Sequence, residues 1–171
     1  MGARVRLRDL TLDDADLLDA WAAEEQSEFN DFGEGPQPLP RDAIARGPLR
    51  NERNGMLVIE RIEDGQVIGS VGWHRVNYGP GTKSDAWNFG IELHPSARGQ
   101  GLGAEAQHLL AEFLFDTYDL NRVEASTDVE NIAEQRSLEK AGFVREGIQR
   151  GAQWRAGAYH DLVTYSRLRT D

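Results

Sequence analysis

Apolar residues recur along the chain in two spacings, which predict an alternation of strands and helices. Short apolar or alternating runs, the pattern of β-strands, cover residues 5–7, 56–62, 67–73, 86–93, 122–127, 143–149 and 159–167. Runs with apolar residues three and four positions apart, the pattern of amphipathic helices, cover residues 12–25, 102–118, 131–141 and, more briefly, 40–50. We interpret residues 29–40 and 77–84 as loops, because they are rich in glycine, proline and polar side chains.

Local signals mark where several of these elements begin and end. Thr11 stands three residues before Asp14, which makes it an N-cap for the first helix. The segment 63–66, Glu-Asp-Gly-Gln, is a hairpin signal between two strands, and Gly142 fits the position just after a helix. The element order predicts an α/β fold of the α+β type, with a mixed, mostly antiparallel central sheet of about seven strands flanked by helices.

Composition narrows the classes of protein to which the chain can belong. Its 171 residues fit a single domain, 1–171, without repeats. The formal net charge of −10 argues against nucleic-acid binding and favours a cationic small substrate, although solubility alone explains it equally well. No run approaches the length of a membrane span, and residues 1–8 lack a signal-peptide core. The absence of cysteine excludes disulfides and thiolate chemistry and fits a cytoplasmic protein; the scattered histidines predict no metal site.

A glycine-rich segment lies between the predicted strand 86–93 and the predicted helix 102–118. It reads Arg98-Gly99-Gln100-Gly101-Leu102-Gly103-Ala104. Glycine lets a phosphate approach the backbone closely, and the first turn of the helix adds free N–H groups and the positive end of its dipole. Arg98 adds a charge-assisted contact. The segment therefore predicts a cradle for a phosphate or pyrophosphate.

Two familiar phosphate loops do not fit this segment. A Walker loop requires Lys and then Ser or Thr after its last glycine, but Ala104 and Glu105 follow here. A Rossmann fingerprint has a different glycine spacing and lies near the start of its βαβ unit. A third possibility, the loop that holds the pyrophosphate of acetyl-CoA, remains.

The segment 98–104 matches the Arg/Gln-x-x-Gly-x-Gly/Ala signature, and the chain resembles the GNAT superfamily of N-acetyltransferases. Two further segments support the resemblance: Asn131-Ile132-Ala133 and the run Ser137-Leu138-Glu139-Lys140-Ala141-Gly142-Phe143. The ending Tyr159-His160-Asp161, with Val163 and Tyr165, resembles the RimJ/RimL-type branch, which acetylates protein N-termini and small amines. The likeness runs from about residue 5 to residue 168.

The resemblance implies where acetyl-CoA binds. Two central strands are expected to splay, with backbone groups from Ile91 to Leu93 binding the pantetheine arm. The pyrophosphate is expected on Arg98, Gly99, Gln100, Gly101, Leu102, Gly103 and Ala104. The resemblance implies a contact from Asn131 to the cofactor arm, although Asn131 also fits a helix N-cap. Arg136 and Ser137 are candidates to reach the thiol end or the phosphates, with a solvated helix face as the alternative.

N-acetylation requires a group that removes a proton from the acceptor, since a free aliphatic amine is mostly ammonium at neutral pH. Glu92, at the end of its strand, is our first candidate base; His74 and Glu134 are the second and third. The sequence departs from many relatives at two positions. Leu138 stands where they carry a tyrosine, and Glu134 stands where RimL-like members carry a serine. A tyrosine acid at that position is therefore excluded, and the thiolate is free to leave without one.

Four residues are candidates for the acceptor side. Phe29 and Phe32 lie in an acidic, glycine-rich loop suited to cover an amine. Asn88 lies on the same strand face as Glu92, and Trp73 is a further candidate, although tryptophan is more often a core residue.

The function predicted from the sequence is acetyl-CoA-dependent N-acetylation of a primary amine by direct transfer in a ternary complex, since no cysteine is available for a thiol acyl-enzyme. The acceptor is a peptide or protein N-terminus or a small amine, and the resemblance suggests a homodimer. Three alternatives stay open: a longer acyl group such as succinyl, a non-catalytic acyl-CoA sensor of the same fold, and, more weakly, a nucleotide-binding module.

Overall fold

The computed structural model describes residues 3–24 and 28–171, and within them seven strands form one sheet in the order β1-β2-β3-β4-β5-β7-β6. Every neighbouring pair is antiparallel except β4 and β5. The strands are β1 (Val5–Arg8), β2 (Asn54–Arg61), β3 (Val67–Asn77), β4 (Asp85–Leu93), β5 (Arg122–Asp128), β6 (Val144–Arg155) and β7 (Ala158–Leu168). The helices are α1 (Leu12–Glu24), α2 (Arg41–Arg46), α3 (Leu102–Thr117) and α4 (Ile132–Lys140), with short 3₁₀ turns η1 (Glu28–Asn30), η2 (Thr82–Ser84) and η3 (Pro95–Ala97). This arrangement confirms the predicted fold class.

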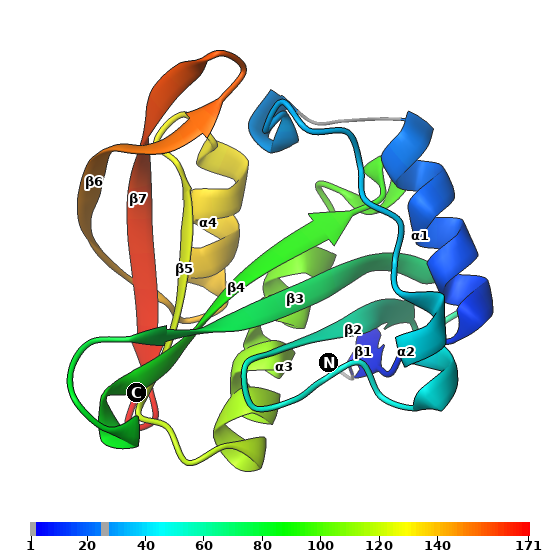
Figure 1. Ribbon diagram of the computed structural model, residues 1–171, viewed down its shortest axis with the longest axis horizontal. Helices are drawn as coiled ribbons and strands as arrows, with labels where there is room; N and C mark the ends of the chain where they lie inside the picture. The colour runs from blue at the N-terminus through cyan, green and yellow to red at the C-terminus, as the bar shows by residue number, and fades with distance from the viewer. Residues whose placement is uncertain (1–2, 25–27) are drawn as a thin grey trace.

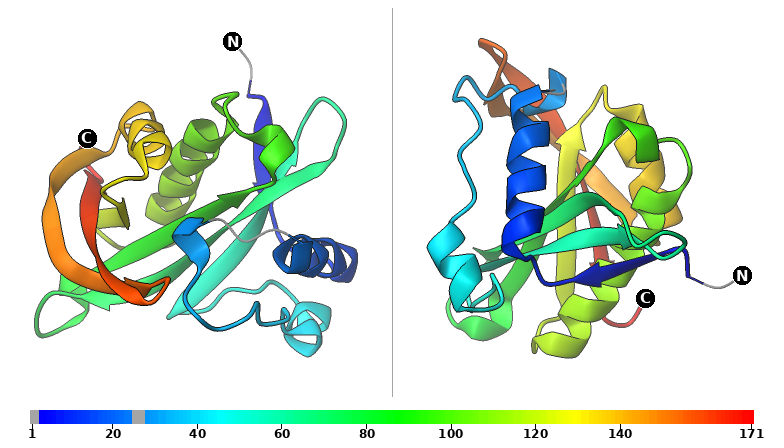
Figure 2. Two further views of the ribbon diagram at one scale, coloured as in Figure 1. Left: turned by 90° about the horizontal axis from the view of Figure 1, so that it is seen from above. Right: turned by 90° about the vertical axis from the view of Figure 1, so that its right-hand side faces the viewer.

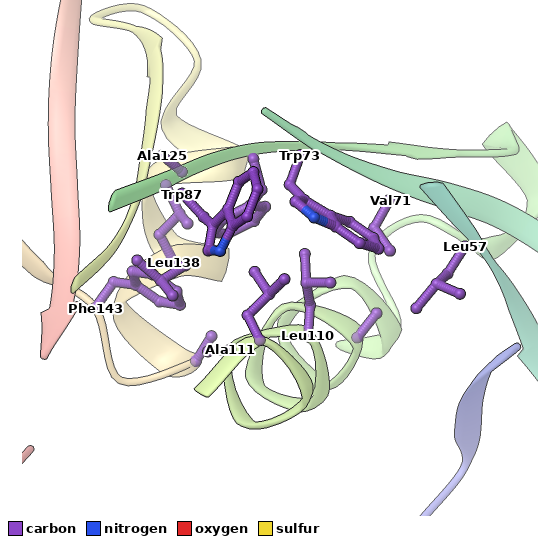
Figure 3. Close-up of a cluster of buried hydrophobic side chains, with 14 of the residues drawn as sticks. Leu57, Val71, Trp73, Trp87, Leu110, Ala111, Ala125, Leu138 and Phe143 are labelled. Atoms are coloured by element: carbon purple, nitrogen blue, oxygen red, sulfur yellow. The ribbon is translucent and has the colours of Figure 1, made fainter. Parts of the chain in front are cut away.

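Helices cover both faces of the sheet (Figure 2). α3 and α4 pack on one face, and α1 and α2 pack on the other. The main core lies under α3, where Leu110 and Ala111 are fully buried against the sheet (Figure 3). A smaller core lies under α1 and α2, where Ala15 and Ile44 pack against Val58. Because side chains alternate across a strand, β2 supplies both cores from consecutive residues.

The central strands β4 and β5 diverge after a short parallel contact. Their register covers only Trp87 with Val123 and Asn88 with Glu124. Beyond it, residues Phe89–Leu93 have β3 as their one strand neighbour in the described sheet. Figure 1 shows the two strands separating toward the end at which α4 begins. The predicted splay is thus present, and it lies beside the glycine-rich segment and the start of α4.

Several element ends differ from those that the sequence predicts. β3 continues four residues beyond the predicted 67–73, to Asn77. The prediction that the last two strands stop at 149 and resume at 159 is wrong, because β6 reaches Arg155 and β7 begins at Ala158. β6 is an edge strand with mostly exposed residues, so it carries no apolar alternation to reveal its length. Glu25, the predicted end of the first helix, lies outside the described residues.

Other local predictions are confirmed. Thr11 Oγ1 accepts a hydrogen bond from the Asp14 N–H at 3.3 Å, and the Asp14 carboxylate accepts one from the Thr11 N–H at 2.8 Å, a reciprocal cap at the start of α1. Gly142 follows α4 with φ of +90°, in the left-handed region. Within the described residues, no helix is long and apolar enough to cross a membrane.

Candidate active site

The glycine-rich segment forms a tight turn at the N-terminus of α3. Gly99 and Gly101 have φ of +73° and +77°, which other residues adopt only with strain, and Gly101 is the N-cap of α3. Arg98 donates from Nε to the Leu93 carbonyl at 2.9 Å, and Gln100 donates from Nε2 to the Ser96 carbonyl at 2.8 Å. The turn is therefore tied back to the end of β4, with the free N–H groups of the first turn of α3 next to it.

The start of β1 supports the same turn from outside. Arg4 donates from Nη1 to the Gln100 carbonyl at 2.9 Å. The Glu105 carboxylate, in the first turn of α3, accepts from Arg4 Nε at 3.0 Å and from the Val5 N–H at 3.2 Å. We did not predict these supports from the sequence, because they join residues about a hundred positions apart.

Gly103 marks the point where β4, α3 and α4 meet. A Cβ added there would lie 3.2 Å from Leu93 Cδ1, 3.4 Å from Ser137 Oγ and 3.9 Å from Ile91 Cδ1. The structure thus brings together four of the residues predicted to bind the cofactor. The missing side chain leaves space between them that any larger residue would fill.

Asn131 caps α4. Its side-chain oxygen accepts from the Glu134 N–H at 3.3 Å, and its Nδ2 donates to Thr127 Oγ1 at 3.1 Å. The N-cap interpretation is therefore confirmed, while a contact to the cofactor arm stays a prediction. Arg136 is exposed on α4, beside the half-buried Ser137.

A buried glutamine connects α3 to α4 beside this corner. Gln107 is fully buried; it donates from Nε2 to Glu134 Oε1 at 2.5 Å and accepts from Ser137 Oγ at 2.9 Å. Burial raises the pKa of the Glu134 carboxyl to about 7, against the opposing effect of the Gln107 hydrogen bond. Gln107 was not among the predicted residues, although its spacing from Leu110 and Leu114 places it on the apolar face of α3.

On the other face of the sheet, a cavity of about 450 Å³ lies between α1 and the ends of β3 and β4. Glu92 and Arg98 line it from the β4 side, and Trp21 and Glu24 line it from α1. The Glu92 side chain is exposed to the cavity and makes no hydrogen bond or ion pair with any residue in 3–24 or 28–171. The Trp21 ring lies 4.6 Å from the ring of His94, which also lines the cavity. The cavity thus combines an available carboxylate with an aromatic wall.

The candidate base His74 and two of the predicted acceptor residues, Asn88 and Trp73, lie outside this cavity. His74 is exposed on β3, opposite Asn88 in register. Asn88 donates from Nδ2 to Glu124 Oε1 at 3.3 Å and does not line the cavity with Glu92. Trp73 is buried in the main core, with its ring 5.8 Å from Phe113, so its role in this structure is packing.

The two loop phenylalanines lie in different environments. Phe29, in η1, lies under the guanidinium of Arg155 at 5.2 Å, whereas the Phe32 side chain is about half exposed. Within the described residues, no group of three or more His, Asp and Glu side chains is placed to hold a metal ion.

Comparison with known protein families identifies the class of protein to which this architecture belongs. The model of the family described as "Acetyltransferase (GNAT) domain" matches residues 4–144. The chain belongs to the GNAT acetyltransferase family. It is an acetyltransferase, and acetyl-CoA is the donor that this family uses.

Curated GNAT relatives match over nearly the whole chain at low identity. An uncharacterized N-acetyltransferase, p20 of Bacillus licheniformis, is 26% identical, and the match covers 98% of this chain and 94% of that protein. A putative ribosomal N-acetyltransferase, YdaF of Bacillus subtilis, is 27% identical over 97% of this chain and 86% of that protein. The RimJ/RimL-type branch is thus only weakly supported.

Solved GNAT structures show the same fold. The spermidine N-acetyltransferase of Vibrio cholerae, in complex with CoA and spermine, has a TM-score of 0.77 at 19% identity, covering 99% of this chain and 98% of that one. Mycobacterium smegmatis RimJ, in complex with CoA-disulfide, has a TM-score of 0.77 at 23% identity, covering 97% and 82%.

The residues of this GNAT chain fit acetyl-CoA. Gly99 and Gly101 adopt the left-handed conformation that a phosphate-binding turn uses, next to the positive end of the α3 dipole. Gly103 keeps a side chain out of the space between β4 and α4. The backbone of β4 from Phe89 to Leu93 pairs with β3 on one side and is not paired with β5 on the other, so it offers hydrogen-bonding groups for an extended arm.

Proposed function

We propose that the protein transfers an acetyl group from acetyl-CoA directly to a primary amine, with Glu92 removing the proton of the acceptor. The observation that carries the proposal is the Glu92 carboxylate, which has no hydrogen-bond or ion-pair partner among the described residues and lies in the cavity at the end of β4, beside the glycine-rich turn. The donor supplies an activated acetyl thioester. The residues of this chain bind the two substrates and move protons.

The donor side of the site lies at the splay of β4 and β5. Arg98 and the backbone from Gly99 to Ala104 would hold the pyrophosphate, because this turn ends at the N-terminus of α3. The backbone at Ile91 and Leu93 would bind the pantetheine arm alongside β4. Ser137 reaches the same corner from the middle of α4, and Asn131 lies at the N-cap of that helix.

Glu92 is the base in this proposal. A carboxylate attracts an ammonium ion, and it can take the proton directly or through one water before the amine attacks the thioester. Glu24 and Trp21 on the opposite wall suit the same cationic acceptor. His74 stays a second candidate, outside the cavity.

Glu134 is better placed for the leaving thiolate than for the amine. It belongs to α4, across the sheet from the cavity of Glu92, and Gln107 holds its carboxyl against α3. Because its pKa is about 7, part of the Glu134 population is protonated at neutral pH and can donate to the sulfur. Leu138, at the position of the relatives' tyrosine, is fully buried and has no proton to give.

The acceptor class follows from charge. The described part of the segment after α1 contains Glu28, Asp31 and Glu34, which favour a cation near the cavity. The names of the relatives include a spermidine and a ribosomal N-acetyltransferase, so a polyamine and a protein N-terminus are the two acceptor types to test first. We also propose that the protein belongs to the RimJ/RimL-type branch and is cytoplasmic. It would form a homodimer in which each chain is a single domain over residues 1–171.

A panel of amines assayed for release of free CoA thiol tests the proposal. We expect acetyl-CoA turnover with at least one polyamine or peptide N-terminus, and an acetylated product of the matching mass. Acetyl-CoA binding without thiol release across the panel would instead favour the acyl-CoA sensor. Turnover with succinyl-CoA but not acetyl-CoA would favour the longer acyl group.

A further inference from the structure

A buried ion pair joins the tip of the β6–β7 hairpin to the end of β5. Arg155, the last residue of β6, is 3% exposed, and its guanidinium pairs with the Asp128 carboxylate, which is 4% exposed. Asp128 also fixes the turn into α4, because its Oδ1 accepts from the Glu130 N–H at 2.7 Å and its carbonyl accepts from the Asn131 N–H at 3.0 Å. One carboxylate thus connects the hairpin with the corner where α4 begins.

The same arginine holds the segment that follows α1. Its guanidinium donates to the carbonyl of Glu28 and lies over the ring of Phe29, 5.2 Å from the ring centroid. The next residue, Ala156, donates its N–H to the Asp31 carbonyl at 2.8 Å. Figure 1 shows the hairpin tip beside η1, although the two are at opposite ends of the sequence. Arg155 is therefore a three-way junction between β5, the hairpin and residues 28–31.

This junction is a poor device for stability alone. The Nε of Arg155 is buried with no hydrogen-bond partner in the described residues, and an unsatisfied buried donor destabilises a fold. A buried ion pair recovers its desolvation cost only with complete hydrogen bonding. The planar, forked guanidinium is better suited to hold separate parts of the chain together, because it can bind a carboxylate and a carbonyl while it stacks on a ring.

Residues 28–31 lie between two parts of the chain that line the cavity of Glu92. Trp21 and Glu24 line it before this segment, and Gln37 and Leu39 line it afterwards. A displacement of residues 28–31 would therefore also shift the residues before and after them that line the cavity where we place the acceptor. The cofactor turn at 98–101 has supports of its own, from Arg4 and Leu93.

We propose that Arg155 is a positioning residue for the acceptor: it holds residues 28–31 against the end of β5 and so fixes the acceptor wall relative to the donor corner. This inference rests on the proposed function, in which the cavity of Glu92 receives the amine. Arg155 itself is expected to contact neither substrate.

The experiment compares Arg155→Gln and Arg155→Lys with Arg150→Gln. Arg150 is exposed on the same strand, so its replacement removes one positive charge without touching the junction. For Arg155→Gln we expect the KM of the amine to rise about tenfold, with the Kd of acetyl-CoA changed less than about threefold. Arg155→Lys can keep the pair with Asp128 but lacks the fork, so we expect a near-normal melting temperature with the raised amine KM.

A second measurement needs no activity. Hydrogen exchange should become faster at the Ala156 amide and in residues 28–40 of both Arg155 variants, and remain unchanged in Arg150→Gln. Unchanged exchange, or an amine KM equal to that of the wild type in a folded Arg155→Lys, would overturn the inference. Absence of any acetyl transfer by the wild type would overturn the proposed function instead, and the exchange data would still show whether Arg155 holds the segment.

Discussion

The Glu134 carboxyl shows how burial changes the chemistry of a residue. Gln107 holds it between α3 and α4, and burial raises its pKa to about 7. A solvent-exposed glutamate is almost fully ionised at neutral pH. A carboxyl that is partly protonated at neutral pH can donate a proton to a thiolate, and it also makes the stability of the fold depend on pH.

The sign of that dependence is fixed by the direction of the pKa shift. The folded protein holds the Glu134 proton to a higher pH than the unfolded chain does, so this carboxyl lowers stability progressively between about pH 4.5 and pH 7. Replacing Glu134→Gln keeps a neutral side chain at every pH. We expect the free energy of unfolding of the variant, compared with that of the wild type, to rise by on the order of 2 kcal/mol as the pH increases from 5 to 8.

Urea unfolding of both proteins at pH 5 and at pH 8 measures this difference in stability. Glu130→Gln is the control, because Glu130 is exposed in the turn just before α4. An equal pH dependence in wild type and Glu134→Gln would show that the Glu134 carboxyl titrates at its ordinary pKa.

For single residues, the sequence indicates which side chains have suitable chemistry but does not indicate which other residues contact them in the fold. Glu92 and Glu134 are candidates from their positions alone, but the environment that distinguishes them comes from residues far apart in sequence. Gln107 is a polar residue on an apolar helix face, and no local pattern indicates its partner. Arg155 contacts residues 28 and 128, which no local pattern connects to it.

Among the elements, α3 is the helix at whose N-terminus we propose that the donor binds. Gly101 caps it with φ of +77°, where a non-glycine residue is strained by roughly 1–2 kcal/mol. Gly103 leaves open the space beside Leu93 and Ser137. Both glycines shape the start of the helix where we place the pyrophosphate.

Calorimetry with acetyl-CoA tests this placement. We expect Gly103→Val to weaken binding about tenfold or more, because its methyl groups would fill the space against Leu93 and Ser137. Gly101→Ala should weaken binding less, through strain in the turn. Gly147→Ala is the matched control, since a Cβ there meets nothing within 4 Å. Undiminished affinity in Gly103→Val would place acetyl-CoA elsewhere.

The elements themselves follow well from the sequence where burial imposes a pattern. β2, β4 and α3 pack against the core, and their predicted bounds lie within a few residues of those observed. The edge hairpin of β6 and β7 was predicted too short, because its outer residues are exposed and backbone pairing alone extends it. The splay of β4 and β5 was expected only from the family resemblance.

For the whole molecule, the proposed function places the two substrates on opposite faces of the sheet. α3 and α4 lie on the face where we place the donor, and α1 covers the cavity where we place the acceptor amine (Figure 2). The formal net charge is −10, so the protein as a whole attracts cations. This charge would favour a cationic acceptor and disfavour the anionic donor.

Salt dependence tests the role of this charge. As salt rises from about 20 mM to about 200 mM, we expect kcat/KM for a polycationic amine to fall severalfold, because screening weakens steering. An acceptor amine that is uncharged at the assay pH is the control and should show little change. A fall of the same size for both acceptors would exclude electrostatic attraction of the acceptor.

The most direct test of the account is the rate of Glu92→Gln across pH, measured by thiol release with the best acceptor. We predict that kcat/KM for the amine falls about a hundredfold or more at neutral pH, with unchanged acetyl-CoA affinity, because the amide cannot accept the proton. Glu63→Gln, an exposed replacement in the β2–β3 turn, should keep the wild-type rate. A wild-type rate and pH profile in Glu92→Gln would contradict the assignment of Glu92 as the base.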